Sequence, residues 1–77
     1  RPPMLAWILV VELMLPGQPA APVGIMPGYH TEAECRDNLA RIARGEYTTV
    51  FTDDGAQLRI VRGITCIVRT VDAPATS

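Results

Sequence analysis

The chain has 77 residues, of which 48% are hydrophobic and 19% are charged, and its formal net charge is −1 at pH 7. Such a chain forms a single domain, expected over residues 1–77. So small a domain buries only roughly 60–65% of its unfolded surface, so a covalent cross-link or a partner should stabilise it. The balanced charge excludes nucleic acid as an expected partner, and two cysteines with one histidine fall short of the four ligands of a structural zinc site.

Charged residues are scarce in the first thirty positions, where only Arg1 and Glu12 occur. An average protein would carry about seven charged residues in a segment of that length. The rest of the chain holds six arginines and seven acidic residues, so an apolar first section is followed by an ordinary soluble one. Because the sequence begins with Arg1, removal of an export signal and loss of a disordered start are both open explanations.

The apolar run at residues 4–15 is predicted to be a long strand. As a helix its 12 residues would rise about 18 Å, short of the roughly 30 Å hydrocarbon core of a membrane, and Glu12 would lie inside it. The β-branched and aromatic residues of the run, and prolines at both of its ends, favour extended structure. Alternate residues then share a face: Leu5, Trp7, Leu9, Val11 and Leu13 on one side, and Ala6, Ile8, Val10, Glu12 and Met14 on the other.

Both faces of this strand are apolar, which predicts that both are buried. One helix covers only one face of a small sheet, so the other face predicts a protein partner, self-association or contact with a membrane surface. Trp7 is the expected aromatic centre of the partner-binding surface. That surface is predicted to consist of Leu5, Trp7, Leu9, Val11 and Leu13.

A hairpin is predicted after the first strand, with a turn at residues 17–22 and a short return strand at residues 23–26. Pro27 and Gly28 should end the return strand. Pro19 and Pro22 fit the loop of this hairpin better than a hydrogen-bonded ladder.

A helix is predicted to begin at Thr31, because Thr31 and Glu34 have the spacing of a capping box. Gly45 is the expected residue at its C-terminal end. The residues at helical spacing that should form its buried stripe are Cys35, Leu39 and Ile42.

A second hairpin is predicted from residues 47–51 and 57–61, which flank an Asp-Gly turn. Arg62 and Gly63 should break the chain before a last strand at residues 64–71, and residues 72–77 should form a loose tail. The predicted fold is α+β in the order β-β-α-β-β-β, with one helix packed on one face of a small, mainly antiparallel sheet. The arginines of its last strands are predicted to form either a solvated sheet edge or a basic patch; they are Arg59, Arg62 and Arg69.

A disulfide is predicted between Cys35 and Cys66, because a helix lying across the last strand would bring the two side chains together. Closing a loop of about 32 residues should stabilise the domain by roughly 3–4 kcal/mol. Such a bond indicates an oxidising compartment, either a periplasm or the outside of the cell. The alternative is that both are ordinary buried thiols in a cytosolic protein.

The sequence predicts no catalytic residues, no metal site and no cofactor. One thiol-enzyme hypothesis pairs Cys35, near a helix N-terminus, with His30 as a base, and it requires a free thiol. Asp53 and Asp54 are explained by turn chemistry, and no set of oxygen ligands at calcium-binding spacing is present.

We expect a non-catalytic accessory or structural subunit that binds a larger protein assembly through the apolar strand, in a periplasmic or extracellular setting. Association with a membrane-adjacent assembly is compatible with this expectation. The alternative is a small-ligand or lipid-binding module that uses the same apolar surface as a pocket, with the thiol enzyme as a third hypothesis.

Overall fold

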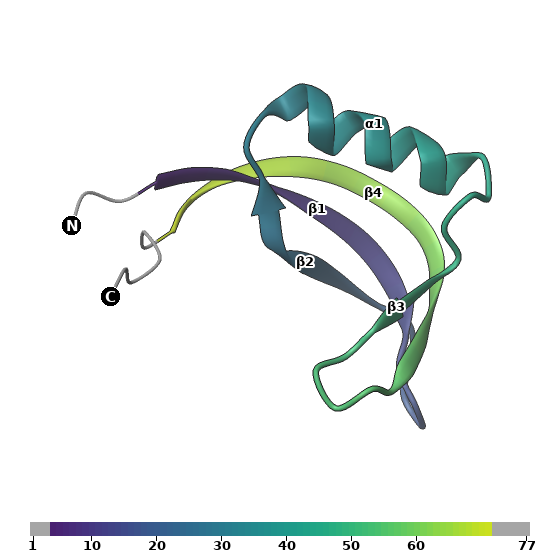
Figure 1. Cartoon of the computed structure of the whole chain (residues 1–77). Coiled ribbons are helices and arrows are strands. Elements are labelled where there is room, and N and C mark those ends of the chain that lie inside the picture. The colour runs from purple at the N-terminus through teal and green to yellow at the C-terminus, as the bar shows by residue number, and fades with distance from the viewer. Residues whose placement is uncertain (1–3, 72–77) are drawn as a thin grey trace.

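The computed structural model describes residues 4–71. Its elements in chain order are strand β1 (Met4–Met14), strand β2 (Ala21–Tyr29), helix α1 (Glu32–Ala43), strand β3 (Thr49–Phe51) and strand β4 (Gln57–Val71). Figure 1 shows β1 and β4 as a long curved pair, with α1 on one side of it. The predicted loose tail at residues 72–77 lies outside the described residues.

All four strands belong to one antiparallel sheet in the order β2-β1-β4-β3. The register of β1 and β4 places Met4 opposite Val71 and Met14 opposite Arg59, so the two strands pair over the whole length of β1. β2 pairs with the other edge of β1 from Trp7 onward. The predicted α+β class, with one helix packed on one face of a mainly antiparallel sheet, is confirmed.

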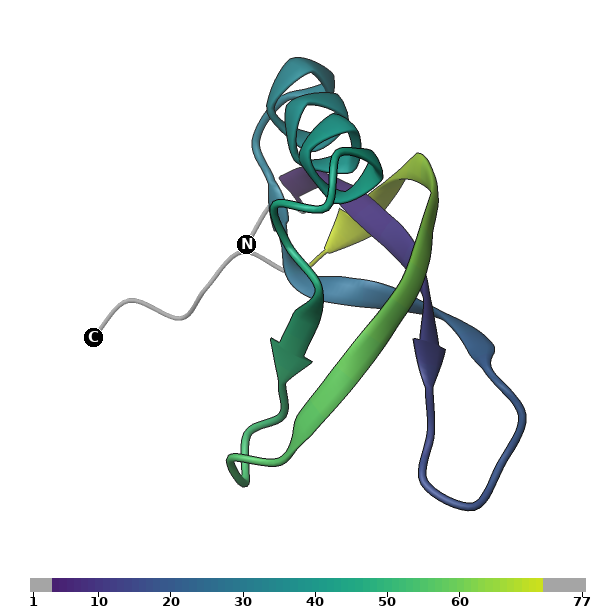
Figure 2. The ribbon, with the colours of Figure 1, turned by 90° about the vertical axis from the view of Figure 1, so that its right-hand side faces the viewer.

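The last two strands of the predicted order are one continuous strand, β4, which contains Arg62 and Gly63. Its pairing with β1 shifts register at two places. Such bulges bend a strand without ending it, and Figure 2 shows β4 bending sharply near its middle. Gly63 permits a close approach of the helix, because a Cβ at this position would lie 2.5 Å from Cδ1 of Leu39 on α1.

β2 extends beyond its predicted end and continues through Pro27 and Gly28 to Tyr29. Its pairing with β1 is irregular between Ile25 and Tyr29, so the Pro-Gly pair lies in a distorted stretch of the strand. Pro22, expected in the preceding loop, also lies inside β2. A proline is tolerated there because β2 is an edge strand, where one side of the backbone needs no ladder partner.

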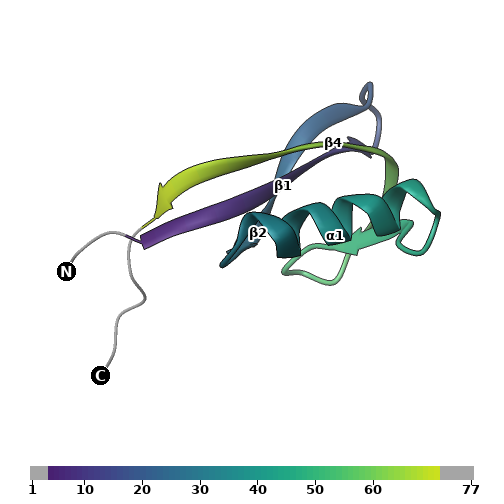
Figure 3. The ribbon, with the colours of Figure 1, turned by 90° about the horizontal axis from the view of Figure 1, so that it is seen from above.

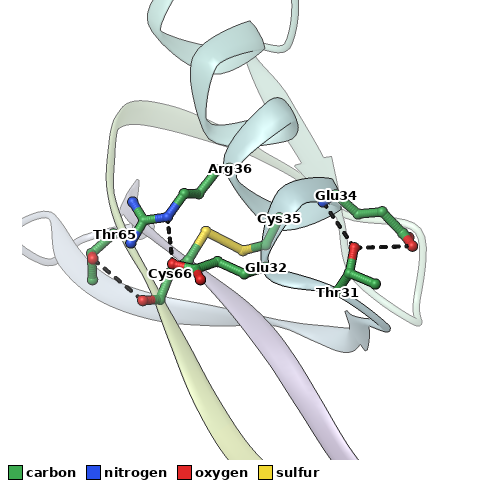
Figure 4. Close-up of polar contacts among 7 residues, drawn as sticks. All are labelled: Thr31, Glu32, Glu34, Cys35, Arg36, Thr65 and Cys66. Carbon is green, nitrogen blue, oxygen red and sulfur yellow. Dashed lines mark hydrogen bonds and ion pairs between the residues drawn. A yellow bond between two sulfur atoms is a disulfide. The ribbon is translucent and has the colours of Figure 1, made fainter.

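The ends of α1 are where the sequence predicts them. The Thr31 hydroxyl accepts a hydrogen bond from the Glu34 backbone N–H at 3.2 Å, and donates to the Glu34 carboxylate at 3.3 Å (Figure 4). In a full capping box the carboxylate would instead accept from the Thr31 backbone N–H. At the C-terminal end Gly45 has a φ of 79°, and the N–H groups of Gly45 and Glu46 donate to carbonyls of the last turn at 3.0 and 2.9 Å. This is the Schellman arrangement, which favours glycine.

The second hairpin is shorter than predicted on its first strand, since β3 begins at Thr49. Its turn is as expected, with Gly55 at a φ of 88° and its N–H donating to the Thr52 carbonyl at 2.9 Å. β3 pairs with β4 over residues 57–59.

The core lies between α1 and the sheet. The buried residues that form it are Leu9, Val11, Leu13, Cys35, Ile60 and Cys66. Leu39 and Ile42 of the predicted helical stripe are half-buried and pack against it. None of the described residues forms a helix long and apolar enough to cross a membrane.

Candidate functional site

The five residues predicted to bind a partner lie in two different environments. Leu9, Val11 and Leu13 belong to the domain's own core, and Val11 has no exposed surface. These three side chains are therefore not available to a partner. Leu5 is 66% exposed, and Trp7 is half-buried with one part packed against the core. A docking surface on this face of β1 is thus restricted to its first residues.

These first residues belong to a two-stranded arm, which we define as residues 4–7 of β1 and 68–71 of β4. Figures 1 and 3 show the outer part of this β1–β4 segment extending beyond the ends of both β2 and α1. Val68 lies opposite Trp7 in the register and is 48% exposed. Directly opposed residues share a face of the sheet, as do alternate residues of one strand. One face of the arm therefore carries Leu5, Trp7 and Val68, which we call the arm patch.

The predicted disulfide joins Cys35 to Cys66, whose Cα atoms are 6.2 Å apart. Figure 4 shows the bond linking the first turn of α1 to the sheet. Both cysteines are buried, and Cys35 has no exposed surface. A disulfide is consistent with an oxidising compartment, as the sequence predicts.

The disulfide also bears on the thiol-enzyme hypothesis, which requires a free thiol at Cys35. In this structure the sulfur of Cys35 is bonded, and His30 lies exposed before the helix. Among residues 4–71, no group of three or more histidine, cysteine or acidic side chains is arranged to hold a metal ion.

The Asp54 side chain of the second hairpin is accounted for by the turn. The Asp54 carboxylate accepts from the Thr52 hydroxyl and from the Ala56 N–H, and these bonds hold its pKa below the usual value. Both partners are local backbone or side-chain groups of the same turn, as expected for aspartate in this position.

The face of the sheet opposite α1 contains an open hollow of about 410 Å³. Ile8 and Val10 of β1 form its floor, and Met26 of β2 lies at one side. Residues of β4 line the other side, namely Ile67, Arg69, Thr70 and Val71. Although it faces away from the helix, Ile8 is only 4% exposed. The second apolar face of β1 is therefore partly covered by the curl of the sheet itself.

Two glycines of β2 allow this close packing over Ile8. A Cβ on Gly24 would lie 2.9 Å from Cγ2 of Ile8, and one on Gly28 would lie 2.7 Å from its Cδ1. Neither position has room for a side chain without movement of the neighbouring atoms. The floor of the hollow is thus a fixed part of the packed sheet.

The three arginines of β4 do not form one patch. The exposed Arg62 side chain lies 3.7 Å from the half-buried Glu12 carboxylate. Arg59 is opposite Met14, and Arg69 lines the hollow. Arg59 and Arg69 are ten positions apart along β4, a contour of about 33 Å. Past Ile60, whose N–H donates to the Thr48 carbonyl at 2.9 Å, the described part of β4 has an edge to which β3 does not extend.

A second opening of about 330 Å³ lies between α1 and the sheet. Its lining includes Tyr29 and Tyr47, and the Arg41 guanidinium donates to the Tyr47 hydroxyl at 3.0 Å. Burial, with smaller contributions from Tyr47 and Glu34, raises the pKa of the Tyr29 phenol above its ordinary value.

Comparison with protein-family models, curated proteins and solved structures finds no significant match to this chain. The geometry of the arm, the hollow and the disulfide is therefore the basis on which function can be argued.

Proposed function

We propose that the protein is a non-catalytic accessory subunit that binds a partner protein of a larger assembly through its arm. The observation that carries this proposal is the exposure of Leu5 and Val68 on one face, at 66% and 48%, beside the aromatic ring of Trp7. An aromatic residue within an apolar patch is the usual centre of a protein interface. Exposed apolar residues gathered on one projecting element are also unusual unless a partner covers them.

The backbone of the arm supports the same proposal. β2 pairs with β1 from Trp7 onward, so residues 4–6 of β1 have an edge that β2 does not reach. β3 pairs with β4 only at residues 57–59, so it does not reach the outer edge of residues 68–71. Unpaired strand edges are sites at which a partner adds a strand through main-chain hydrogen bonds. We therefore propose that the partner contacts the arm patch with apolar side chains and extends one of these edges.

We further propose that this assembly is periplasmic or extracellular. The support is the disulfide between Cys35 and Cys66, because reducing compartments rarely retain structural disulfides.

The proposal is tested by site-specific photo-cross-linking in the cells that make the protein. A benzophenone side chain at position 5 should cross-link to a discrete partner, because Leu5 lies at the proposed interface. The matched control places the same group at Ala40, which is exposed on α1 and distant in sequence from the arm.

A second substitution makes the result specific to the patch. Val68→Asp should abolish the cross-link from position 5 while the domain stays folded, because it places a charge opposite Trp7 on an exposed site. Equal cross-linking from positions 5 and 40, or a position-5 cross-link unaffected by Val68→Asp, would show that the arm is not the docking surface.

A further inference from the structure

The hollow on the face opposite α1 combines an apolar floor with a single cation at its side. Ile8 and Val10 form the floor, and Ile67, Arg69 and Val71 alternate along β4 so that they share this face. Thr70, between Arg69 and Val71, also contributes to the lining. Its volume of about 410 Å³ is within the range of small-molecule sites. An occupant would therefore meet mainly hydrocarbon and one positive charge.

The hollow is open, and its apolar side chains are partly exposed to solvent. Met26 is 61% exposed and Val10 is half-buried. Among residues 4–71, no carboxylate forms an ion pair with Arg69, whereas Arg62 of the same strand is paired with Glu12. A guanidinium in this position is suited to a carboxylate, which it binds through charge-assisted hydrogen bonds.

We propose that this hollow binds the anion of a single-chain fatty acid, with the hydrocarbon over Ile8 and Val10 and the carboxylate at Arg69. Two features of the hollow favour this class of ligand. The floor is fixed by the packing of Ile8 against Gly24 and Gly28, so the surface is formed before a ligand binds. The apolar part of the hollow and the Arg69 charge lie side by side, as the chain and the carboxylate do in a fatty acid anion. The residues of the arm patch do not line the hollow.

Paired ligands test the proposal, namely decanoate and its uncharged counterpart decanol, titrated below their aggregation concentrations. Binding is followed in ¹H–¹⁵N correlation spectra of the folded, disulfide-bonded protein. Decanoate should shift the amide signals of Val10, Met26 and Ile67, and decanol should shift the same signals with lower affinity. Vesicles of phosphatidylglycerol should not bind, because their chains are held in a bilayer.

Two variants then distinguish recognition of the carboxylate by Arg69 from a general attraction of the anion to positive charge on the protein. Arg69→Gln should weaken decanoate binding about tenfold, the loss of one charge-assisted contact, and leave decanol binding unchanged. Arg59→Gln removes the same charge from the same strand outside the hollow and should leave both affinities unchanged.

Three results would overturn the proposal. They are the absence of shifts around the hollow with decanoate, equal decanoate affinity in Arg69→Gln and the unmodified protein, and equal weakening by Arg59→Gln. Binding to vesicles without binding of decanoate would likewise contradict a single-chain ligand and favour a membrane surface. Because none of these results involves the arm patch, they leave the proposed docking function untouched.

Discussion

Single residues fix several features of this fold through contacts that can be tested individually. Gly28 is the most constrained of the glycines over Ile8, because a Cβ there would lie 2.7 Å from the Trp7 carbonyl oxygen as well as from Ile8. A backbone atom in a paired strand cannot move aside as the end of a side chain can. The identity of this residue is therefore set by the packing of β2 on β1.

We predict that Gly28→Ala lowers the free energy of unfolding by about 1–3 kcal/mol, the usual cost of overpacking. Urea denaturation monitored by Trp7 fluorescence measures it. Gly24→Ala is the matched comparison and should cost less, since the nearest atom belongs to one side chain. Equal stability of Gly28→Ala and the unmodified protein would contradict the described packing.

The cap of α1 gives a second prediction at this scale. Thr31→Ala removes the hydroxyl that accepts the Glu34 N–H and should lower the free energy of unfolding by about 1 kcal/mol. Thr31→Ser keeps the hydroxyl and should lose little. If both variants are equally destabilised, the methyl group of Thr31, rather than the cap, is responsible.

At the scale of elements, the disulfide fixes α1 on the sheet. It joins Cys35 in the first turn of the helix to Cys66 in β4, across a sequence separation of 31 residues. The helix contacts β4 more than any other strand, and Gly63 lets Leu39 approach that strand closely. The bond and the glycine thus anchor α1 at two places along β4.

We predict that reduction lowers the free energy of unfolding by about 3–4 kcal/mol in the chain-entropy model. A domain of this size has only about 4–12 kcal/mol in total, so the disulfide should supply a large share of the stability. Urea denaturation with and without reductant measures the difference, and Cys35→Ala/Cys66→Ala should behave like the reduced protein. A reduced protein as stable as the oxidised one would mean that the core alone maintains the fold.

Across the whole molecule, most of the details that the sequence predicts correctly have local causes. The cap at Thr31, the glycine at position 45 and the turn at Gly55 each follow from the conformation of a few consecutive residues. The disulfide follows from a helix and a strand packed face to face. The predicted strand break at Gly63 is wrong. This glycine instead allows Leu39 of the helix to approach β4 closely, and that contact joins segments that are distant in sequence.

The candidate docking surface shows the same division. Both faces of β1 are apolar, so the sequence does not reveal which residues the helix covers. The prediction that Leu9, Val11 and Leu13 bind a partner is therefore wrong, because these residues form the core. The arm depends on where β2 and α1 end relative to β1, which is a property of the assembled sheet. The hollow arises from the curl of the sheet and has no motif in the sequence.

The central claim is that the arm patch holds the protein in an assembly. The most direct test is the apparent size at which the protein elutes from native extracts. We predict that the unmodified protein elutes well above the size of the free chain on size-exclusion chromatography. Leu5→Asp should elute as the free chain, with a free energy of unfolding within about 0.5 kcal/mol of the unmodified protein, because Leu5 is exposed. Elution of the unmodified protein as a free monomer, or an unchanged complex in Leu5→Asp, would contradict the account.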